Sequence, residues 1–211
     1  MFGFFNKIFN KSLCEPLESR KKLDNYLFNY IFNLIKKNDI KKVLEIGFGN
    51  KTFIEGLAFK VNEKREDNRV IFVGVEKKLP DSVNYGIENL NIYLHYSSDI
   101  INPNIINYLV NKYGKFDLIY SWFVFHLIEE SFVLFENLNY LLNDKGYLLF
   151  TVNCSNLLCE RRPVPCEDII LALKSYFRIL EIKSFFFKDK PHKSCEREHY
   201  HLGIFVVAKK K

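Results

Sequence analysis

The sequence predicts an α/β protein in which helices cover both faces of a mostly parallel β-sheet. Short apolar runs alternate along the chain with segments whose apolar residues recur every three or four positions, which is typical of strands joined by crossover helices. The last two apolar runs are joined by a link too short for a crossover helix, so they must pair antiparallel. With 211 residues, 48% of them hydrophobic, the chain is long enough for one domain with a substantial core.

The expected elements follow one another in a regular order. An amphipathic helix over residues 20–37 precedes the sheet, because its apolar residues recur at helical spacing between flanking lysines. After it we expect strands at about 42–46, 70–76, 90–96, 116–121, 147–152, 177–187 and 201–209, helices at about 52–61, from near 102, at 129–142 and at 169–176, and a turn at 143–146. Residues 1–39 thus form a helical extension, or lid, on a domain that spans residues 40–211.

The segment 43–53 is the one around which the chain is organised. Its apolar strand contains Glu45 and ends in Gly47 and Gly49, and a helical pattern follows at once. Glycine suits such a junction of strand, turn and helix, because a side chain would block the positive φ angle or the approach of a ligand. A buried carboxylate needs a partner or a ligand, so we expect the side chain of Glu45 at the carboxyl end of the strand.

Glu45, Gly47 and Gly49 resemble the first motif of the class I S-adenosylmethionine-dependent methyltransferases, in which an acid precedes glycines at alternate positions. Lys51 stands where a third glycine is usual in that family, and a cation there repels the sulfonium of the cofactor unless it points to solvent. The resemblance implies that the three matching residues, with Phe48 between the glycines, hold the methionine end of S-adenosylmethionine.

Acidic residues also follow the second and third strands. Glu76 closes an apolar strand, and in nucleotide-binding sheets an acid at this place accepts hydrogen bonds from ribose hydroxyls. Asp99 follows the third strand, where members of the same family often contact the adenine amino group; alternatively, it caps the helix that begins near Asn102. Lys77 and Ser98 are the neighbours of these acids, and the resemblance places them beside the cofactor as well.

The segment 116–128 resembles the fourth-strand motif of the family, in which Phe-Asp opens the strand and a small polar residue closes it. The resemblance implies that Ser121 and Trp122 lie near the transferred methyl group. The resemblance also implies that His126, in the apolar run that follows, lies beside the cofactor. It is either a general base, since histidine titrates near neutrality, or a packed wall residue.

These motifs cover roughly residues 40–208 and imply a Rossmann-like three-layer sandwich, with a mostly parallel seven-stranded sheet that ends in an antiparallel hairpin. They imply an enzyme that transfers a methyl group from S-adenosylmethionine to an acceptor, either a small molecule or RNA. Methyl transfer of this kind is a direct displacement at the sulfonium, so the orientation of donor and acceptor supplies much of the barrier reduction. No catalytic residue is therefore assigned.

Two other classes of function stay open. Lys51 also suits a methyltransferase-like protein that no longer catalyses and serves as a binding or scaffold subunit. The other class is an NAD(P)-dependent oxidoreductase, although Glu45 inside the strand and Thr52, where the dinucleotide fingerprint has its last glycine, count against it. The glycine run also resembles the tRNA guanine-N7 methyltransferases, but Ser121-Trp122-Phe123 stands in place of their Pro-Asp-Pro-Trp signature.

Charge and hydropathy bear on the possible partners. The net charge of +6 is compatible with RNA, although part of it comes from the terminal run 209–211. If the acceptor is RNA, phosphate contacts are expected on the basic link 188–200. No apolar run is long enough to span a membrane. The aromatic stretch 1–9 packs on the domain, covers the active site or lies at a membrane interface.

The five cysteines lie at no framework spacing, and the chain shows no secretory pattern, so we expect a cytoplasmic protein. Cysteines and histidines do gather in residues 154–201, and His192, Cys195 and His199 form the best local cluster. Their spacing matches no compact zinc motif. We therefore expect buried free thiols and polar histidines in this region, and no metal.

Overall fold

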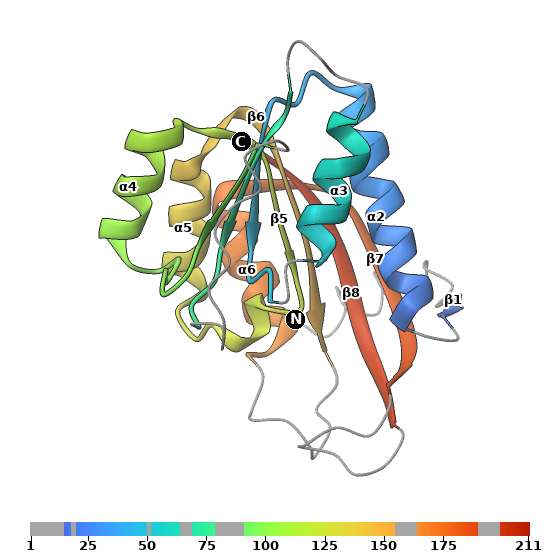
Figure 1. Ribbon diagram of the computed structural model, residues 1–211. Helices are drawn as coiled ribbons and strands as arrows, with labels where there is room; N and C mark the ends of the chain where they lie inside the picture. Colours follow the sequence, from blue (N-terminus) through green and yellow to red (C-terminus); the bar gives the residue numbers. More distant parts are fainter. Residues whose placement is uncertain are drawn as a thin grey trace.

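The computed structural model describes residues 15–17, 20–49, 52–63, 69–78, 91–154, 164–189 and 199–211. Its helices and strands form three layers, with one sheet between two sets of helices (Figure 1). In chain order the elements are β1 (Glu15–Leu17), α2 (Arg20–Lys37), β2 (Lys42–Ile46), α3 (Thr52–Asn62), β3 (Ile71–Val75), β4 (Ile92–His95), α4 (Pro103–Tyr113), β5 (Phe116–Trp122), η2 (Phe125–Leu127), α5 (Ser131–Leu141), β6 (Leu142–Asn153), α6 (Cys166–Tyr176), β7 (Phe177–Asp189) and β8 (His199–Lys210).

The strands form one sheet in the order β1-β7-β8-β6-β5-β2-β3-β4. Strand β8 runs antiparallel to its neighbours β6 and β7, and the other neighbouring strands are parallel. The mostly parallel seven-stranded sheet with its antiparallel C-terminal hairpin is thus confirmed. The sheet also has an eighth strand that was not predicted, β1, which pairs with the end of β7.

Helices cover both faces of the sheet, which explains why its parallel strands read as continuous apolar runs. Helices α2 and α3 lie on one face, and α4, α5 and α6 lie on the other (Figure 1). Successive residues of β2 serve the two faces: Val43 packs with residues of α2 and α3, and Leu44 packs with residues of α4, α5 and α6. Both side chains are fully buried. None of the helices that the structure describes is long and apolar enough to cross a membrane.

The turn expected at 143–146 lies inside β6 and not between two elements. The pairing of β6 with β5 passes from Phe116 and Leu142 to Leu118 and Tyr147, so the register shifts there. Lys145 takes up the extra length with a positive φ of 68°. A bulge of this kind has the turn-forming residues of a loop, which is why the sequence alone suggested one.

The interpretation in which Asp99 caps α4 is wrong. Asn102 occupies the N-cap, and its side-chain oxygen accepts a hydrogen bond from the backbone N–H of Asn104 at 2.9 Å. Pro103 begins the helix, a position where its missing N–H costs nothing. Asp99 instead accepts a hydrogen bond from the backbone N–H of Ile101, in the turn before the helix.

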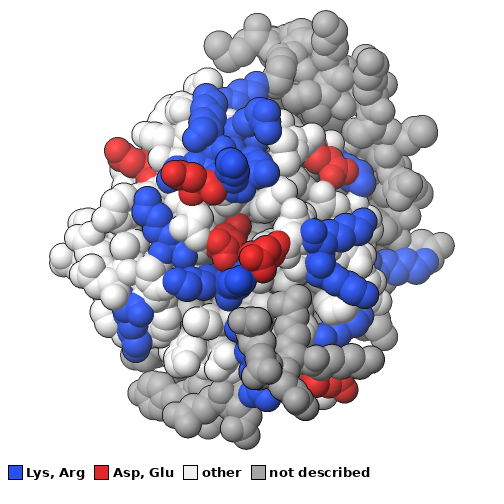
Figure 2. Space-filling view, turned by 90° about the horizontal axis from the view of Figure 1, so that it is seen from above, with Lys and Arg blue, Asp and Glu red and all other residues white. Residues whose placement is uncertain are grey.

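Helices α4, α5 and α6 all end at the edge of the sheet where the parallel strands begin. Three lysines donate hydrogen bonds to carbonyl groups at these helix ends: Lys42 to Tyr113 at 2.7 Å, Lys210 to Leu142 at 3.0 Å and Lys211 to Lys174 at 2.6 Å. Cations at this place offset the partial negative charge of the helix C-termini. Figure 2 shows lysines and arginines gathered on this edge, where these three lysines stabilise the helix ends.

Replacing Lys210 with methionine is expected to lower the free energy of unfolding by about 1 kcal/mol, because the end of α5 loses a charged donor. The side chain of Lys210 is only 13% exposed, and methionine keeps most of its apolar contacts. Urea denaturation measures the change. Lys41→Met is the matched control, since Lys41 is 59% exposed and pairs with the exposed Asp39; it should change stability by less than about 0.5 kcal/mol. Equal losses in the two variants would contradict the helix-capping role.

Candidate functional site

The glycine turn lies at the carboxyl edge of the sheet, where the parallel strands end. Gly47 and Gly49 adopt positive φ angles of 74° and 53°, as the turn requires. The backbone N–H of Gly47 donates to the carbonyl of Val75 at 2.8 Å, and the N–H of Gly49 donates to Glu76 Oε2 at 3.1 Å. Both hydrogen bonds join the turn after β2 to the end of β3.

A cavity of about 520 Å³ lies beside this turn. Its described lining residues come from four elements: Asp24, Asn25 and Phe28 from α2, Glu45, Gly47, Phe48 and Gly49 from β2 and its turn, Thr52 and Phe53 from α3, and Trp122 from the end of β5. Five predicted cofactor residues are thus brought together, namely Glu45, Gly47, Phe48, Gly49 and Trp122. Lys51 lies outside the described residues.

Glu45 is buried in the wall of the cavity, with 2% of its surface exposed. The Tyr120 hydroxyl, from the paired position on β5, donates a hydrogen bond to Glu45 Oε2 at 2.8 Å. Burial raises the pKa of the Glu45 carboxyl to about 8, against the opposing effect of the Tyr120 hydrogen bond, and the negative charge of Glu76 adds to the rise. The pKa of Tyr120 is also raised well above its usual value, first by burial and then by Glu45. At neutral pH the unliganded site therefore holds Glu45 mostly in its neutral form.

A second group of predicted residues lies at the ends of β3 and β4. The Lys77 ammonium pairs with Asp99 at 2.7 Å, and the backbone N–H of Ser98 donates to the carbonyl of Glu76 at 3.0 Å. None of these four residues is among those that line the cavity. Glu76 nevertheless connects the group to the cavity, because it accepts the hydrogen bond from Gly49.

Ser121 and His126 are placed differently from the other predicted residues. Ser121 is fully buried, and its hydroxyl donates to the carbonyl of Ile46 at 2.9 Å, which ties β5 to β2 below the glycine turn. His126 is 5% exposed on η2, and its carbonyl accepts a hydrogen bond from the N–H of Val164 at 2.9 Å. Neither residue lines the cavity. The burial of His126 favours its interpretation as a packed wall residue.

The sequence interpretation missed the contribution of α2 and α3 to the cavity wall. Asp24 and Phe28 lie one helical turn apart on α2, next to the buried stripe of Leu23 and Leu27. The sequence did contain a signal for this: an aromatic residue lies beside an apolar stripe, one helical turn after an acid. It identifies a partly buried face of the helix but not what that face meets.

The expectation of free thiols is wrong for two cysteines. Cys154, just after β6, forms a disulfide with Cys166 at the start of α6, with Cα atoms 5.6 Å apart. Disulfides are typical of oxidising compartments, so this bond lends no support to the predicted cytoplasmic location. Among the described residues, no group of three histidines, cysteines or acids is placed to hold a metal ion. His192 and Cys195 lie outside the described part of the chain.

Comparisons with known proteins point to one fold. No protein-family model and no curated protein matches the sequence. Among solved structures, the N-methyltransferase NodS from Bradyrhizobium japonicum WM9, in complex with S-adenosyl-L-homocysteine, is 15% identical, with a TM-score of 0.57 over 88% of this chain and 86% of NodS. A SAM-dependent methyltransferase from Anabaena variabilis is 16% identical, with a TM-score of 0.58 over 81% of this chain and 77% of that one. The [4+2]-cyclase SpnF is 14% identical, with a TM-score of 0.59 over 94% of this chain and 86% of SpnF.

These likenesses span most of the chain and of each solved structure. The chain thus has the fold of the class I S-adenosylmethionine-dependent methyltransferases, as its motifs predicted.

Proposed function

We propose that the protein is an S-adenosylmethionine-dependent methyltransferase. One observation carries this proposal: a turn with positive φ at Gly47 and Gly49 follows the buried acid Glu45 and is bonded to a second acid, Glu76, beside a cavity at the carboxyl edge of the sheet. Ligands of open α/β sheets bind at this edge. A cofactor with a cationic methionine end and a ribose suits a buried acid followed by a second acid on the next strand.

The contacts support roles for several of the predicted cofactor residues. Glu45 and the glycine turn would hold the methionine end of the cofactor. Glu76 would accept hydrogen bonds from the ribose hydroxyls, since a carboxylate can accept several and its Oε2 already lies next to Gly49. Asp99, with its partner Lys77, would lie near the adenine. Residues 1–39 would act as the lid, which agrees with the part that α2 plays in the cavity wall.

The side chains need to do little in this reaction except hold the methyl donor and the acceptor in place. The acceptor attacks the methyl carbon of the sulfonium, the bond from sulfur to methyl breaks, and the electron pair stays on sulfur. A closed wall of rings and helix would hold donor and acceptor in line and exclude water. The same fold also serves SpnF, a [4+2]-cyclase, so the activity must be tested on this chain. The scaffold and oxidoreductase alternatives rank below the methyltransferase, because no contact of the described residues favours them.

Calorimetric titration of S-adenosylhomocysteine into the purified protein tests the proposal. We expect micromolar binding, and a loss of about 10- to 100-fold in Glu76→Ala, because the ribose loses hydrogen bonds to a charged group. Glu63→Ala is the matched control, since Glu63 is an exposed acid at the end of α3, away from the cavity. If millimolar S-adenosylhomocysteine fails to bind a folded wild-type protein, the proposal is wrong. Thermal stabilisation by NADH alone would favour the oxidoreductase.

A further inference from the structure

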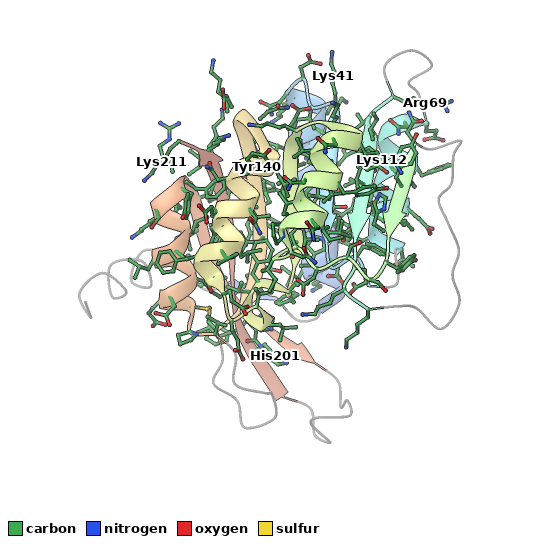
Figure 3. All side chains as sticks on the ribbon, turned by 90° about the vertical axis from the view of Figure 1, so that its left-hand side faces the viewer. Lys41, Arg69, Lys112, Tyr140, His201 and Lys211 are labelled. Carbon is green, nitrogen blue, oxygen red and sulfur yellow. A yellow bond between two sulfur atoms is a disulfide. The ribbon has the colours of Figure 1, made fainter. Side chains whose placement is uncertain are left out.

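The described wall of the cavity differs in its charged residues from the rest of the protein. The chain has 31 lysines and arginines against 25 aspartates and glutamates. The described residues that line the cavity nevertheless include two acids, Asp24 and Glu45, and no lysine or arginine. Basic side chains lie along the opposite edge of the sheet, where Lys41, Arg69 and Lys211 appear at the top of Figure 3. The described wall therefore favours cations and disfavours phosphate groups.

Aromatic rings make up much of the cavity wall. Phe53 contacts both Phe28 and Trp122, with ring centroids 5.5 and 5.2 Å apart and both pairs close to T-shaped. All three rings line the cavity. Ring faces carry partial negative charge and attract an ammonium group within about 6 Å of the centroid. Asp24 lies one helical turn before Phe28 and adds a carboxylate to the same wall.

Trp122 contributes a polar group as well as a ring. Its indole N–H is buried, and no acceptor among the described residues lies within hydrogen-bond distance of Nε1. Buried donors are normally paired in proteins. A ligand in the cavity that Trp122 lines can supply an oxygen as the missing acceptor, in addition to a cationic group for the rings.

On the basis of the proposed function, we propose that the methyl acceptor is a small molecule with a protonated amine, bound between Phe28, Phe53 and Trp122 and beside Asp24. The motif assigns Glu45 and the glycine turn to the donor. The rings of Phe28, Phe53 and Trp122, with the Asp24 carboxylate near them, form the other part of the wall that a second cation would meet. An RNA acceptor would bring phosphates toward the Asp24 carboxylate and the negative faces of the rings, which is electrostatically unfavourable.

The amine must lose a proton before it can react. The ammonium releases one proton to solvent, the nitrogen lone pair attacks the methyl carbon, and a bond from nitrogen to carbon forms as the bond from sulfur to carbon breaks. The electron pair of the broken bond stays on sulfur. The products are S-adenosylhomocysteine and a methylated ammonium, whose positive charge comes from the displacement itself, because the charge of the sulfonium passes to nitrogen. The rings suit this product, because a methylated ammonium is more weakly hydrated and binds well to aromatic faces.

Trp122 makes the test direct, because it is the only tryptophan of the chain. Its fluorescence reports what enters the cavity without any label. The protein is first saturated with S-adenosylhomocysteine, which shows that the donor site works. It is then titrated with tetramethylammonium chloride and, separately, with neopentyl alcohol, an uncharged molecule of similar shape. We expect a saturable fluorescence change with the cation at a concentration at least tenfold lower than with the alcohol.

Variants of residues in the cavity wall show where the molecule that changes the fluorescence binds. Phe53→Leu and Asp24→Asn should each weaken binding of tetramethylammonium by about five- to tenfold, with little change for neopentyl alcohol in Asp24→Asn. Phe59→Leu is the matched control, because Phe59 is 54% exposed on the same helix as Phe53 and does not line the cavity. Asp24 is exposed, so Asp24→Asn should fold even if Phe53→Leu does not.

Transfer of labelled methyl from S-adenosylmethionine completes the test, with small primary and secondary amines compared with matched alcohols, carboxylates and RNA oligonucleotides. Methylation of amines, weakened in Asp24→Asn, supports the proposal. Equal responses to the two fluorescence probes, or methylation confined to RNA, alcohols or carboxylates, would overturn the amine proposal and leave the methyltransferase function intact. Failure of S-adenosylhomocysteine to bind would overturn both.

Discussion

Replacing Gly47 with alanine is expected to lower the free energy of unfolding by roughly 2–5 kcal/mol and to abolish cofactor binding. An alanine at φ 74° costs about 1–2 kcal/mol from backbone strain alone. The new Cβ would also overlap with Val124 Cγ2 and lie 3.3 Å from Val124 Cβ, so the side chain of Val124 must shift. Overpacking of this kind costs about 1–3 kcal/mol more. Chemical denaturation and titration with S-adenosylhomocysteine measure the two effects.

Two other glycines separate the causes of this loss. Gly49 has a φ of 53°, and a Cβ added there would meet no described atom within 4 Å, so Gly49→Ala should cost only the backbone strain, about 1–2 kcal/mol. Gly56 lies inside α3 with only an ordinary contact to Phe28 at 3.7 Å, so Gly56→Ala should stabilise by up to about 1 kcal/mol. If Gly47→Ala costs no more than Gly49→Ala, the overlap with Val124 is not a constraint. If the overlap is real, adding Val124→Ala to Gly47→Ala should recover part of the loss.

The sheet and its glycine turn could be predicted because local sequence determines them. Val43 and Leu44 face opposite layers and are both fully buried, so a parallel strand covered on both faces reads as an unbroken apolar run. Gly47 and Gly49 adopt the backbone angles that only glycine adopts easily. The acid within the run, Glu45, then places the site at the end of that strand.

The far wall of the site could not be predicted in the same way. Helical spacing shows that Phe28 lies on the margin of the apolar face of α2, but not that α3 brings Phe53 against it. The disulfide between Cys154 and Cys166 depends on how β6 and α6 meet in space, and five cysteines leave its pairing open. Strand β1 is too short to show a pattern. Each of these features depends on contacts between distant parts of the chain.

The free energy of unfolding of the unliganded protein is expected to fall as pH rises from about 5 to about 9, because of Glu45. Its carboxyl is neutral in the fold up to a pKa of about 8, but ionises near 4.5 in the unfolded chain. Between these values the folded state binds more protons than the unfolded state, so a rising pH favours unfolding. The contribution of Glu45 to the free energy of unfolding is fully present below pH 4.5 and is lost as the pH rises through 8. This contribution is about 5 kcal/mol at most.

Glu45→Gln isolates this contribution, because an amide keeps the shape and the acceptor for Tyr120 but does not titrate. The variant and the wild type should be equally stable near pH 5, and the variant should be more stable by several kcal/mol near pH 9. Urea denaturation across this range gives the difference, in which the other titrating groups cancel. Tyr120→Phe should move the loss to higher pH, because the Tyr120 hydrogen bond lowers the pKa of Glu45. A pH-independent difference between Glu45→Gln and wild type would mean that Glu45 is ionised in the fold, and a cation would then have to be its partner.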